Sequence, residues 1–316
     1  LGALVAFLQY SQRFFRPISD LSEKFNVLQA AMASSERIFP LLDTPVHIRS
    51  PENHVYRNES ANYQIVFDDV SFAYAGDDYV LRDVSFEVSS GERVGIVGAT
   101  GAGKTTIINL LLRFYDVNRG RVLINGRNVK EFDLQELRKM FGLVLQDVYL
   151  FSGTVEGNIR LGDEKISEAK IRQAAEAVHA DQFINQLPGQ YLSAIAERGA
   201  TLSVGQKQLL SFARALAFDP KILILDEATS SVDTQTEVFI RDALRKLMSG
   251  RTTLAIAHRL STIQDMDKIL VLHRGEIIEV GSHHGLLSQR GLYYKLYRLQ
   301  YADQEQVPDP KDGFVS

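Results

Sequence analysis

An eight-residue run, Gly98-Ala99-Thr100-Gly101-Ala102-Gly103-Lys104-Thr105, has the residue types and spacing of a phosphate-binding loop. The apolar run Val94–Val97 precedes it and a helical apolar pattern follows, which is the strand, loop and helix order that such a loop requires. Glycines let successive backbone N–H groups point at a phosphate, and the helix N-terminus adds its positive dipole end. Lys104 would bridge the outer phosphates, and Thr105 would ligate Mg²⁺. The run predicts an NTPase or a kinase, with a Gly-rich turn as the alternative.

A second set of charged residues follows the apolar run Ile222–Leu225. Asp226 and Glu227 end this predicted buried strand, and in an open parallel sheet ligands bind beyond the carboxyl ends of the strands. Asp226 would hold the hydration shell of Mg²⁺, and Glu227 would orient water for attack on a γ-phosphate. His258 ends the run Thr253–Ala257 and would lie at the same sheet edge. The alternatives are two acidic residues that cap a turn and a structural histidine.

The elements that must position these residues are mostly strands. The pattern favours an antiparallel sheet with one face exposed to solvent at Val66–Tyr74 and in the residues up to Val88. In the latter, polar and apolar positions alternate. The runs with a buried-strand pattern are Val94–Val97, Ile222–Leu225, Thr253–Ala257 and Ile269–Leu272. Helical patterns lie between the last three of these runs. This alternation predicts a parallel α/β core.

Between Gln146 and Gly205 the apolar period becomes helical, and Ser167 is a plausible N-cap. We interpret this stretch as a helical insertion in the α/β domain. The residues from Asp303 to Ser316 are rich in proline and charge, which predicts a disordered tail.

The N-terminal residues predict a helix that leaves a membrane. Leu1–Leu8 is an apolar run shorter than the roughly 20 residues that span a bilayer. Arg13 and Arg16 follow it, as basic residues follow a membrane helix at its cytosolic end. After Pro17 a stripe of apolar residues steps by three and four, which continues a helix against a partner. The stripe consists of Ile18, Leu21, Phe25, Leu28 and Met32. An amphipathic surface helix of a soluble domain is the alternative.

Composition excludes several classes of function. The 316 residues include 45% hydrophobic and 23% charged residues, a globular balance. The net charge of −4 gives no basic excess for nucleic acid, and nucleic acid is therefore not an expected partner. The chain has no cysteine, which excludes disulfides, thiolate catalysis and Cys-ligated metals.

The motifs and their order along the chain resemble those of the nucleotide-binding domain of ABC proteins. The resemblance covers nearly all of residues 63–299. The specific element is Leu202-Ser203-Val204-Gly205-Gln206, which is similar to the ABC signature usually written LSGGQ. Tyr74 matches the aromatic residue that stacks on adenine, and Gln146 matches the Q-loop glutamine. Asp233 matches the D-loop aspartate, and His258 the switch histidine. The resemblance implies an α/β P-loop NTPase fold with an antiparallel β-subdomain and an inserted α-helical subdomain.

The resemblance also implies the site. The implied ATP-binding residues are Tyr74, Gly98, Thr100, Gly101, Ala102, Gly103, Lys104, Thr105, Thr106, Ser203, Gly205, Gln206 and Asp233. The implied catalytic residues are Glu227, His258 and Gln146, and the implied Mg²⁺ ligands are Thr105, Gln146 and Asp226. In this family two such domains hold two ATP molecules head to tail, each ATP between one phosphate loop and the partner's signature. The expected partners are therefore a second nucleotide-binding domain and a transmembrane domain.

Two segments resemble exporters in particular. Glu197-Arg198-Gly199 is similar to the exporter segment that contacts the intracellular helices of the transmembrane domain. The stretch from Phe14 to Ile38 resembles the last transmembrane helix and connector of exporter half-transporters, including multidrug and lipid exporters. The expected organisation is the end of a membrane helix with its connector (1–45), a linker (46–62), the nucleotide-binding domain (63–300) and a disordered tail (301–316). The helical subdomain covers about 147–215, and the domain is expected on the cytoplasmic side of the cell (inner) membrane.

Two positions depart from the family pattern. Val204 replaces the first glycine of the signature, and Leu209 stands where many members carry arginine. A stiff branched side chain beside the phosphate would slow hydrolysis of the ATP that this signature covers. Glu227, in contrast, is intact. This combination of an altered signature with an intact catalytic carboxylate resembles that of heterodimeric exporters. Two other readings stay open: an ABC-type ATPase that acts on nucleic acid, and a regulatory subunit that hydrolyses little ATP.

Overall fold

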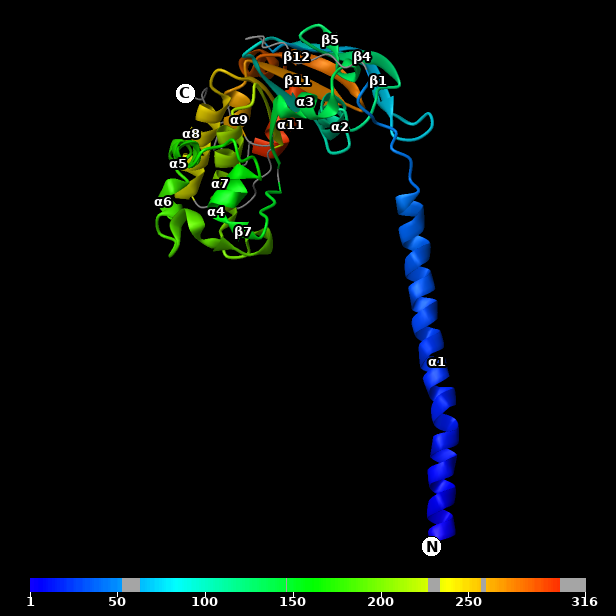
Figure 1. The fold of residues 1–316 in the computed structure, drawn as a ribbon. Helices are drawn as coiled ribbons and strands as arrows, with labels where there is room; N and C mark the ends of the chain where they lie inside the picture. The colour runs from blue at the N-terminus through cyan, green and yellow to red at the C-terminus, as the bar shows by residue number, and fades with distance from the viewer. Residues whose placement is uncertain (53–62, 146, 227–233, 257–259, 302–316) are drawn as a thin grey trace, which may run out of the picture. The chain divides into compact units, whose positions relative to one another are not determined.

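The computed structural model describes residues 1–52, 63–145, 147–226, 234–256 and 260–301 (Figure 1). Gln146, Glu227, Asp233 and His258, as well as the predicted tail from residue 302 on, lie outside the described residues. Contacts divide the chain into two compact units, Leu1–Arg49 and Ser50–Ser316. Each unit is described by itself.

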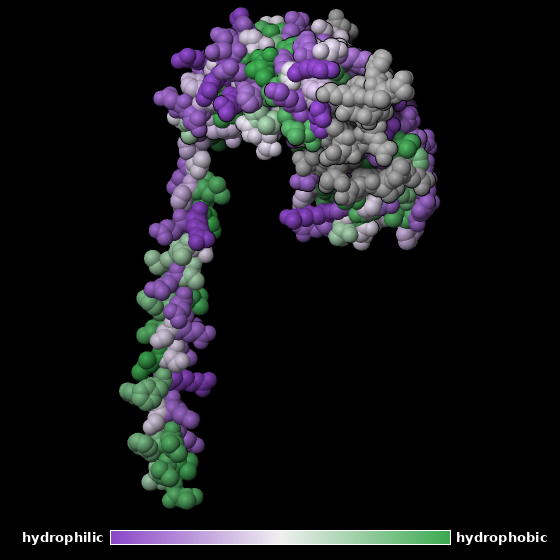
Figure 2. Space-filling view, turned by 180° about the vertical axis from the view of Figure 1, so that it is seen from behind, coloured by the Kyte–Doolittle hydropathy of each residue, from purple (hydrophilic) through white to green (hydrophobic). Residues whose placement is uncertain are grey.

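The first unit is one long helix, α1 (Gly2–Leu42), followed by an extended segment. Pro17 lies inside it, and Pro40 lies in its last turn. The predicted apolar stripe is present, and each of its five side chains is more than half exposed. Figure 2 shows apolar side chains along the helix, densest toward its N-terminal end.

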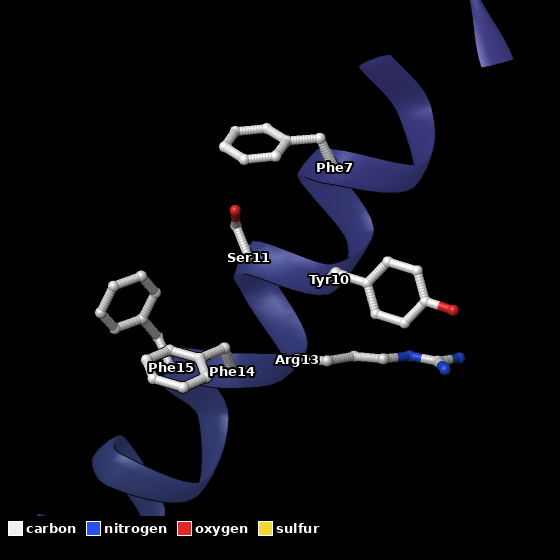
Figure 3. Close-up of a pocket in the computed structure, with 6 residues that line it drawn as sticks. All are labelled: Phe7, Tyr10, Ser11, Arg13, Phe14 and Phe15. Carbon is white, nitrogen blue, oxygen red and sulfur yellow. The ribbon is translucent and has the colours of Figure 1, made fainter. Parts of the chain in front are cut away.

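An aromatic cluster lies near the start of α1. Phe14 and Phe15 meet edge to face, with ring centroids 5.4 Å apart. Figure 3 shows Tyr10 and Arg13 pointing to one side of the helix and Phe7 to the other. Among the described residues, no helix is both long enough and apolar enough to cross a membrane. The interpretation of Leu1–Leu8 as the end of a membrane helix therefore stays a prediction.

The second unit contains the two predicted sheets. The antiparallel sheet has the strand order β2-β1-β4-β5. Its strands are β1 (Ile65–Ala73), β2 (Tyr79–Val88), β4 (Arg119–Ile124) and β5 (Arg127–Asn128). The larger sheet has the order β12-β11-β3-β10-β9-β6. Its strands are β3 (Arg93–Val97), β6 (Phe141–Val144), β9 (Ile222–Asp226), β10 (Thr252–Ile256), β11 (Lys268–His273) and β12 (Glu276–Gly281). All of its pairings are parallel except that of β12 with β11.

Helices surround the larger sheet and form the predicted insertion. The helices outside the insertion are α2 (Lys104–Leu111), α3 (Leu134–Lys139), α8 (Thr234–Met248), α9 (Leu260–Gln264), α10 (His283–Gln289) and α11 (Leu292–Tyr301). The helices of the insertion are α4 (Val155–Arg160), α5 (Glu168–Ala177), α6 (Asp181–Ile184) and α7 (Val204–Phe218). Two short paired strands, β7 (Gly153–Thr154) and β8 (Ala194–Ile195), also belong to it. Ser167 caps α5 as predicted, since its hydroxyl accepts from the backbone N–H of Lys170.

The buried strands separate two hydrophobic cores. In β9, Ile222 and Ile224 belong to the core shared with α2 and the antiparallel sheet. Leu223 and Leu225 belong to the core shared with α7 and α8. Because successive side chains of a strand point to opposite faces, α2 and α7 lie on opposite faces of the larger sheet. This placement separates the two predicted phosphate-contacting segments of one chain.

Candidate functional site

The loop between β3 and α2 is shaped by close backbone contacts. A Cβ atom at Gly98 would lie 2.2 Å from the carbonyl oxygen of Leu272 on β11, so only glycine fits there. Gly103 is the N-cap of α2 with φ 104°, a left-handed conformation that favours glycine. Gly101, with φ 79°, is exposed. These glycines let the loop turn tightly from the strand into the helix.

Lys104 is the buried charge of this loop. Its ammonium donates to the carbonyl oxygens of Gly98 at 2.8 Å and Ala99 at 3.0 Å, and the residue is only 8% exposed. Burial lowers the pKa of Lys104, and the negative charge of Asp226 opposes this lowering. A buried cation that the loop holds with carbonyl dipoles is well suited to a polyphosphate, whose oxygens can take over those hydrogen bonds.

Asp226 lies at the edge of the sheet from which the loop leaves. It is the last residue of β9 and is in register with Ile256 of the neighbouring strand β10. Ile256 is in turn in register with Ile96, two residues before Gly98. The electrostatic effect of Asp226 on Lys104 agrees with this placement. The arrangement is the one in which ligands bind beyond the carboxyl ends of parallel strands.

The donor set at this edge fits Mg²⁺ that is shared with phosphate. Thr105 offers an exposed hydroxyl in the first turn of α2, and Asp226 offers a carboxylate. Among the described residues, no group of three or more His, Cys, Asp or Glu side chains could hold a metal ion. Magnesium usually keeps several waters and binds through one or two side chains and substrate phosphates. A hydroxyl and one carboxylate are sufficient for such a site.

Tyr74 follows the last residue of β1, and its side chain is 49% exposed. Its hydroxyl lies 3.1 Å from that of Thr106 on α2. The structure thus places the predicted adenine-stacking residue beside the helix that begins at the phosphate loop.

The predicted signature begins helix α7. Ser203 is its N-cap, with its hydroxyl accepting from the N–H of Gln206 at 3.2 Å. The Gln206 side chain accepts from the N–H of Ser203 at 3.0 Å, which completes a capping box. Gly205 is buried, whereas Ser203 is exposed. Val204 is 54% exposed, so its side chain changes the surface of the signature and leaves the helix start intact.

The signature helix is tied to the segment that follows Gln146. Arg214 of α7 donates from Nε to the carbonyl of Asn158 at 2.9 Å and also to the carbonyl of Tyr149. Asn158 in turn holds both the N–H and the carbonyl of Phe151. Burial lowers the pKa of Arg214, which donates its hydrogen bonds to carbonyl oxygens of Tyr149 and Asn158. The contact between Arg214 and Asn158 was not predicted from the sequence, although a lone arginine within the apolar run 212–218 signals a buried cation.

The fold and the phosphate loop agree with a match to a known family. Residues 81–230 match the family model described as ABC transporter. Residues 81–230 form an ABC transporter domain. Domains of this family bind ATP with Mg²⁺ and hydrolyse it, so the fold, the nucleotide and the ATPase activity predicted from the sequence are confirmed at the level of the family.

Relatives of the ABC domain extend the similarity over almost the whole chain. A probable multidrug resistance ABC transporter ATP-binding/permease protein of Bacillus subtilis (strain 168) is 46% identical over 97% of this chain and 45% of its own length. A fatty acid ABC transporter ATP-binding/permease protein of Mycobacterium bovis is 46% identical over 94% of this chain and 47% of its own. The structure of a bacterial Atm1-family ABC exporter with ATP bound superposes with a TM-score of 0.78 at 40% identity, over 96% of this chain and 53% of that one. The domain is thus of the ABC exporter type, and the chain spans about half the length of the relatives it matches.

Proposed function

We propose that this chain is the motor of an exporter that moves an apolar or amphipathic solute, such as a drug, a lipid or a peptide, across the cell (inner) membrane. The observation that supports this proposal most directly is that the similarity to exporters covers both α1 and the ABC domain in one chain. The exposed apolar stripe of α1 supports a partner among membrane helices, and the domain would work on the cytoplasmic side. The names of the relatives, multidrug resistance and fatty acid transport, support the class of solute.

In this proposal the chain's own residues bind and orient ATP for hydrolysis to ADP and phosphate. Lys104 neutralises the outer phosphates, and the backbone N–H groups of the loop surround them. Thr105, Asp226 and Gln146 would hold Mg²⁺, which supplies charge neutralisation when bound. Glu227 would accept a proton from the attacking water, and His258 would contact the γ-phosphate.

The test is Glu227→Gln in the full chain. We expect MgATP affinity to stay near the wild-type value while turnover falls by orders of magnitude, because water positioning is lost and the phosphate contacts remain. Glu164→Gln, an exposed carboxylate of the helical insertion, is the control and should leave both unchanged. Wild-type turnover in a folded Glu227→Gln protein would reject the assignment.

The second partner in the proposal is another ABC domain. Ser203 and the N–H groups after it form an anion-binding helix N-terminus, on the opposite sheet face from the chain's own α2. A second chain would bring its phosphate loop to this signature. ATP would then join the two domains, and hydrolysis would release them, rocking the membrane helices between two states.

We further propose that the partner is a different half-transporter with an unaltered signature. Val204 stands on the exposed side of the signature, where a partner's ATP would approach, while the chain's own phosphate loop and Asp226 follow the family pattern. A heterodimer would confine the Val204 change to one of its two sites. The test compares ATPase activity of the full-length subunit alone, its Val204→Gly variant and the co-expressed pair. Robust activity of the lone subunit that is indifferent to Val204→Gly would leave a homodimer.

A further inference from the structure

The tyrosine expected to stack on adenine is tethered by its hydroxyl. Tyr74 Oη accepts from Asn109 Nδ2 at 3.3 Å and lies 3.1 Å from Thr106 Oγ1. Thr106 and Asn109 are three residues apart on α2, so both face the same side of that helix. One phenol thus joins the end of β1 to the helix that begins at the phosphate loop.

Two other rings fix the plane of Tyr74. Phe72 meets it with centroids 4.8 Å apart and planes at 83°, and Tyr115 with centroids 5.0 Å apart and planes at 89°. Phe72 and Tyr115 also contact each other, with centroids 5.6 Å apart. These neighbours stand nearly perpendicular to Tyr74, so neither lies parallel on its ring. Since Tyr74 is half exposed, parallel stacking on it is left to another planar group.

From this geometry we propose that Asn109 is a positioning residue for the nucleobase. The amide holds the Tyr74 hydroxyl and, with the perpendicular rings, keeps the phenol ring in one orientation before nucleotide binds. A ring that is already ordered loses less conformational entropy when a base stacks on it, which increases affinity. The inference rests on the proposed function, because it requires that ATP binds at this phosphate loop with its base on Tyr74.

The test is a double-mutant cycle in the full chain, with MgATP affinity measured by calorimetry. The proteins are wild type, Tyr74→Phe, Asn109→Leu and the double variant. Each single variant should raise the Kd for MgATP by about 2- to 10-fold, the equivalent of one ordinary hydrogen bond. The double variant should bind MgATP no more weakly than Tyr74→Phe alone, because loss of the Tyr74 hydroxyl already removes the hydrogen bond from Asn109. Asn109→Ala repeats the measurement if Asn109→Leu does not fold.

Inorganic tripolyphosphate with Mg²⁺ is the control ligand, since it has phosphates and no base. We expect its affinity to be the same in all of these proteins. Additive effects on MgATP affinity, or no effect of Asn109→Leu, would overturn the proposal. An equal loss of tripolyphosphate affinity would also overturn it, because Asn109 would then support the phosphate loop. If the wild type binds neither ligand, the proposed function itself fails.

Discussion

Two helix N-termini of this domain are expected to meet ATP phosphates, and they are built in opposite ways. In α2, within the described residues, no side chain caps the first turn, and the N-cap Gly103 has a left-handed backbone. Its neighbour Lys104 is buried and charged. In α7 the first turn is closed by the reciprocal bonds of Ser203 and Gln206, and Ser203 and Val204 are exposed.

The difference indicates how each helix N-terminus contributes to ATP binding. The first N–H groups of a helix need partners, and in α2 the loop leaves them to a ligand while Lys104 adds a positive charge. In α7 the capping box already satisfies two donors, so the helix start is stable in a single domain. The phosphate loop is therefore expected to bind nucleotide alone, and the signature to add contacts only when two chains meet.

The largest effect is expected at the tightest contact of the phosphate loop. Gly98→Ala places a Cβ atom 2.2 Å from a backbone oxygen of Leu272, so the loop or β11 must shift. We expect the free energy of unfolding to fall by about 1–3 kcal/mol and MgATP binding to be lost. Gly2→Ala is the control, because a Cβ atom at this first residue of α1 would meet open space and the helical backbone accepts alanine. Wild-type affinity in Gly98→Ala would mean that the loop does not hold phosphate.

Lys104→Ala should act on affinity more than on folding. Charge-assisted hydrogen bonds contribute about 1.5–3 kcal/mol, so the Kd for MgATP should rise about 10- to 100-fold. Lys139→Ala removes an exposed lysine paired with Glu136 and should leave affinity unchanged. Calorimetry on the two variants checks the prediction, and equal affinities would contradict it.

Ser203→Ala should have the smallest effect on the lone chain. Loss of the N-cap should lower the free energy of unfolding by about 1 kcal/mol, with unchanged MgATP affinity at the chain's own loop. Ser167→Ala, which removes the cap of α5, should cost a similar amount of stability. In a Glu227→Gln background only Ser203→Ala should weaken the ATP-dependent dimer. Equal dimerisation of both variants would show that Ser203 acts through stability alone.

Strands and the phosphate loop could be predicted because their signals are local. The runs Val94–Val97 and Ile222–Leu225 correspond to β3 and β9 within a residue at each end. Continuous apolar runs mark strands buried on both faces, and the loop string fixes its own neighbours. The edge strand β12 was not predicted, since half of it is exposed and its residues alternate without a long apolar run.

Other features depend on contacts between distant residues and could not be predicted. Nothing local in the sequence shows that Arg214 reaches the carbonyls of Tyr149 and Asn158, or that Asn109 reaches Tyr74. The placement of α2 and α7 on opposite sheet faces likewise follows only from the two cores into which alternate side chains of β9 pack. The roles of Gln146, Glu227, Asp233 and His258, which lie outside the described residues, stay predictions.

The most direct test asks whether ATP brings the phosphate loop of one chain to the signature of another. These 316 residues contain no cysteine, so Ala99→Cys and Val204→Cys can be placed on separate chains in a Glu227→Gln background. Both positions are exposed. After mixing, a short bifunctional thiol reagent should link the two chains with MgATP present and leave them separate without nucleotide. Linkage that is equal without nucleotide, or absent although each chain binds MgATP, would contradict a site shared between two chains.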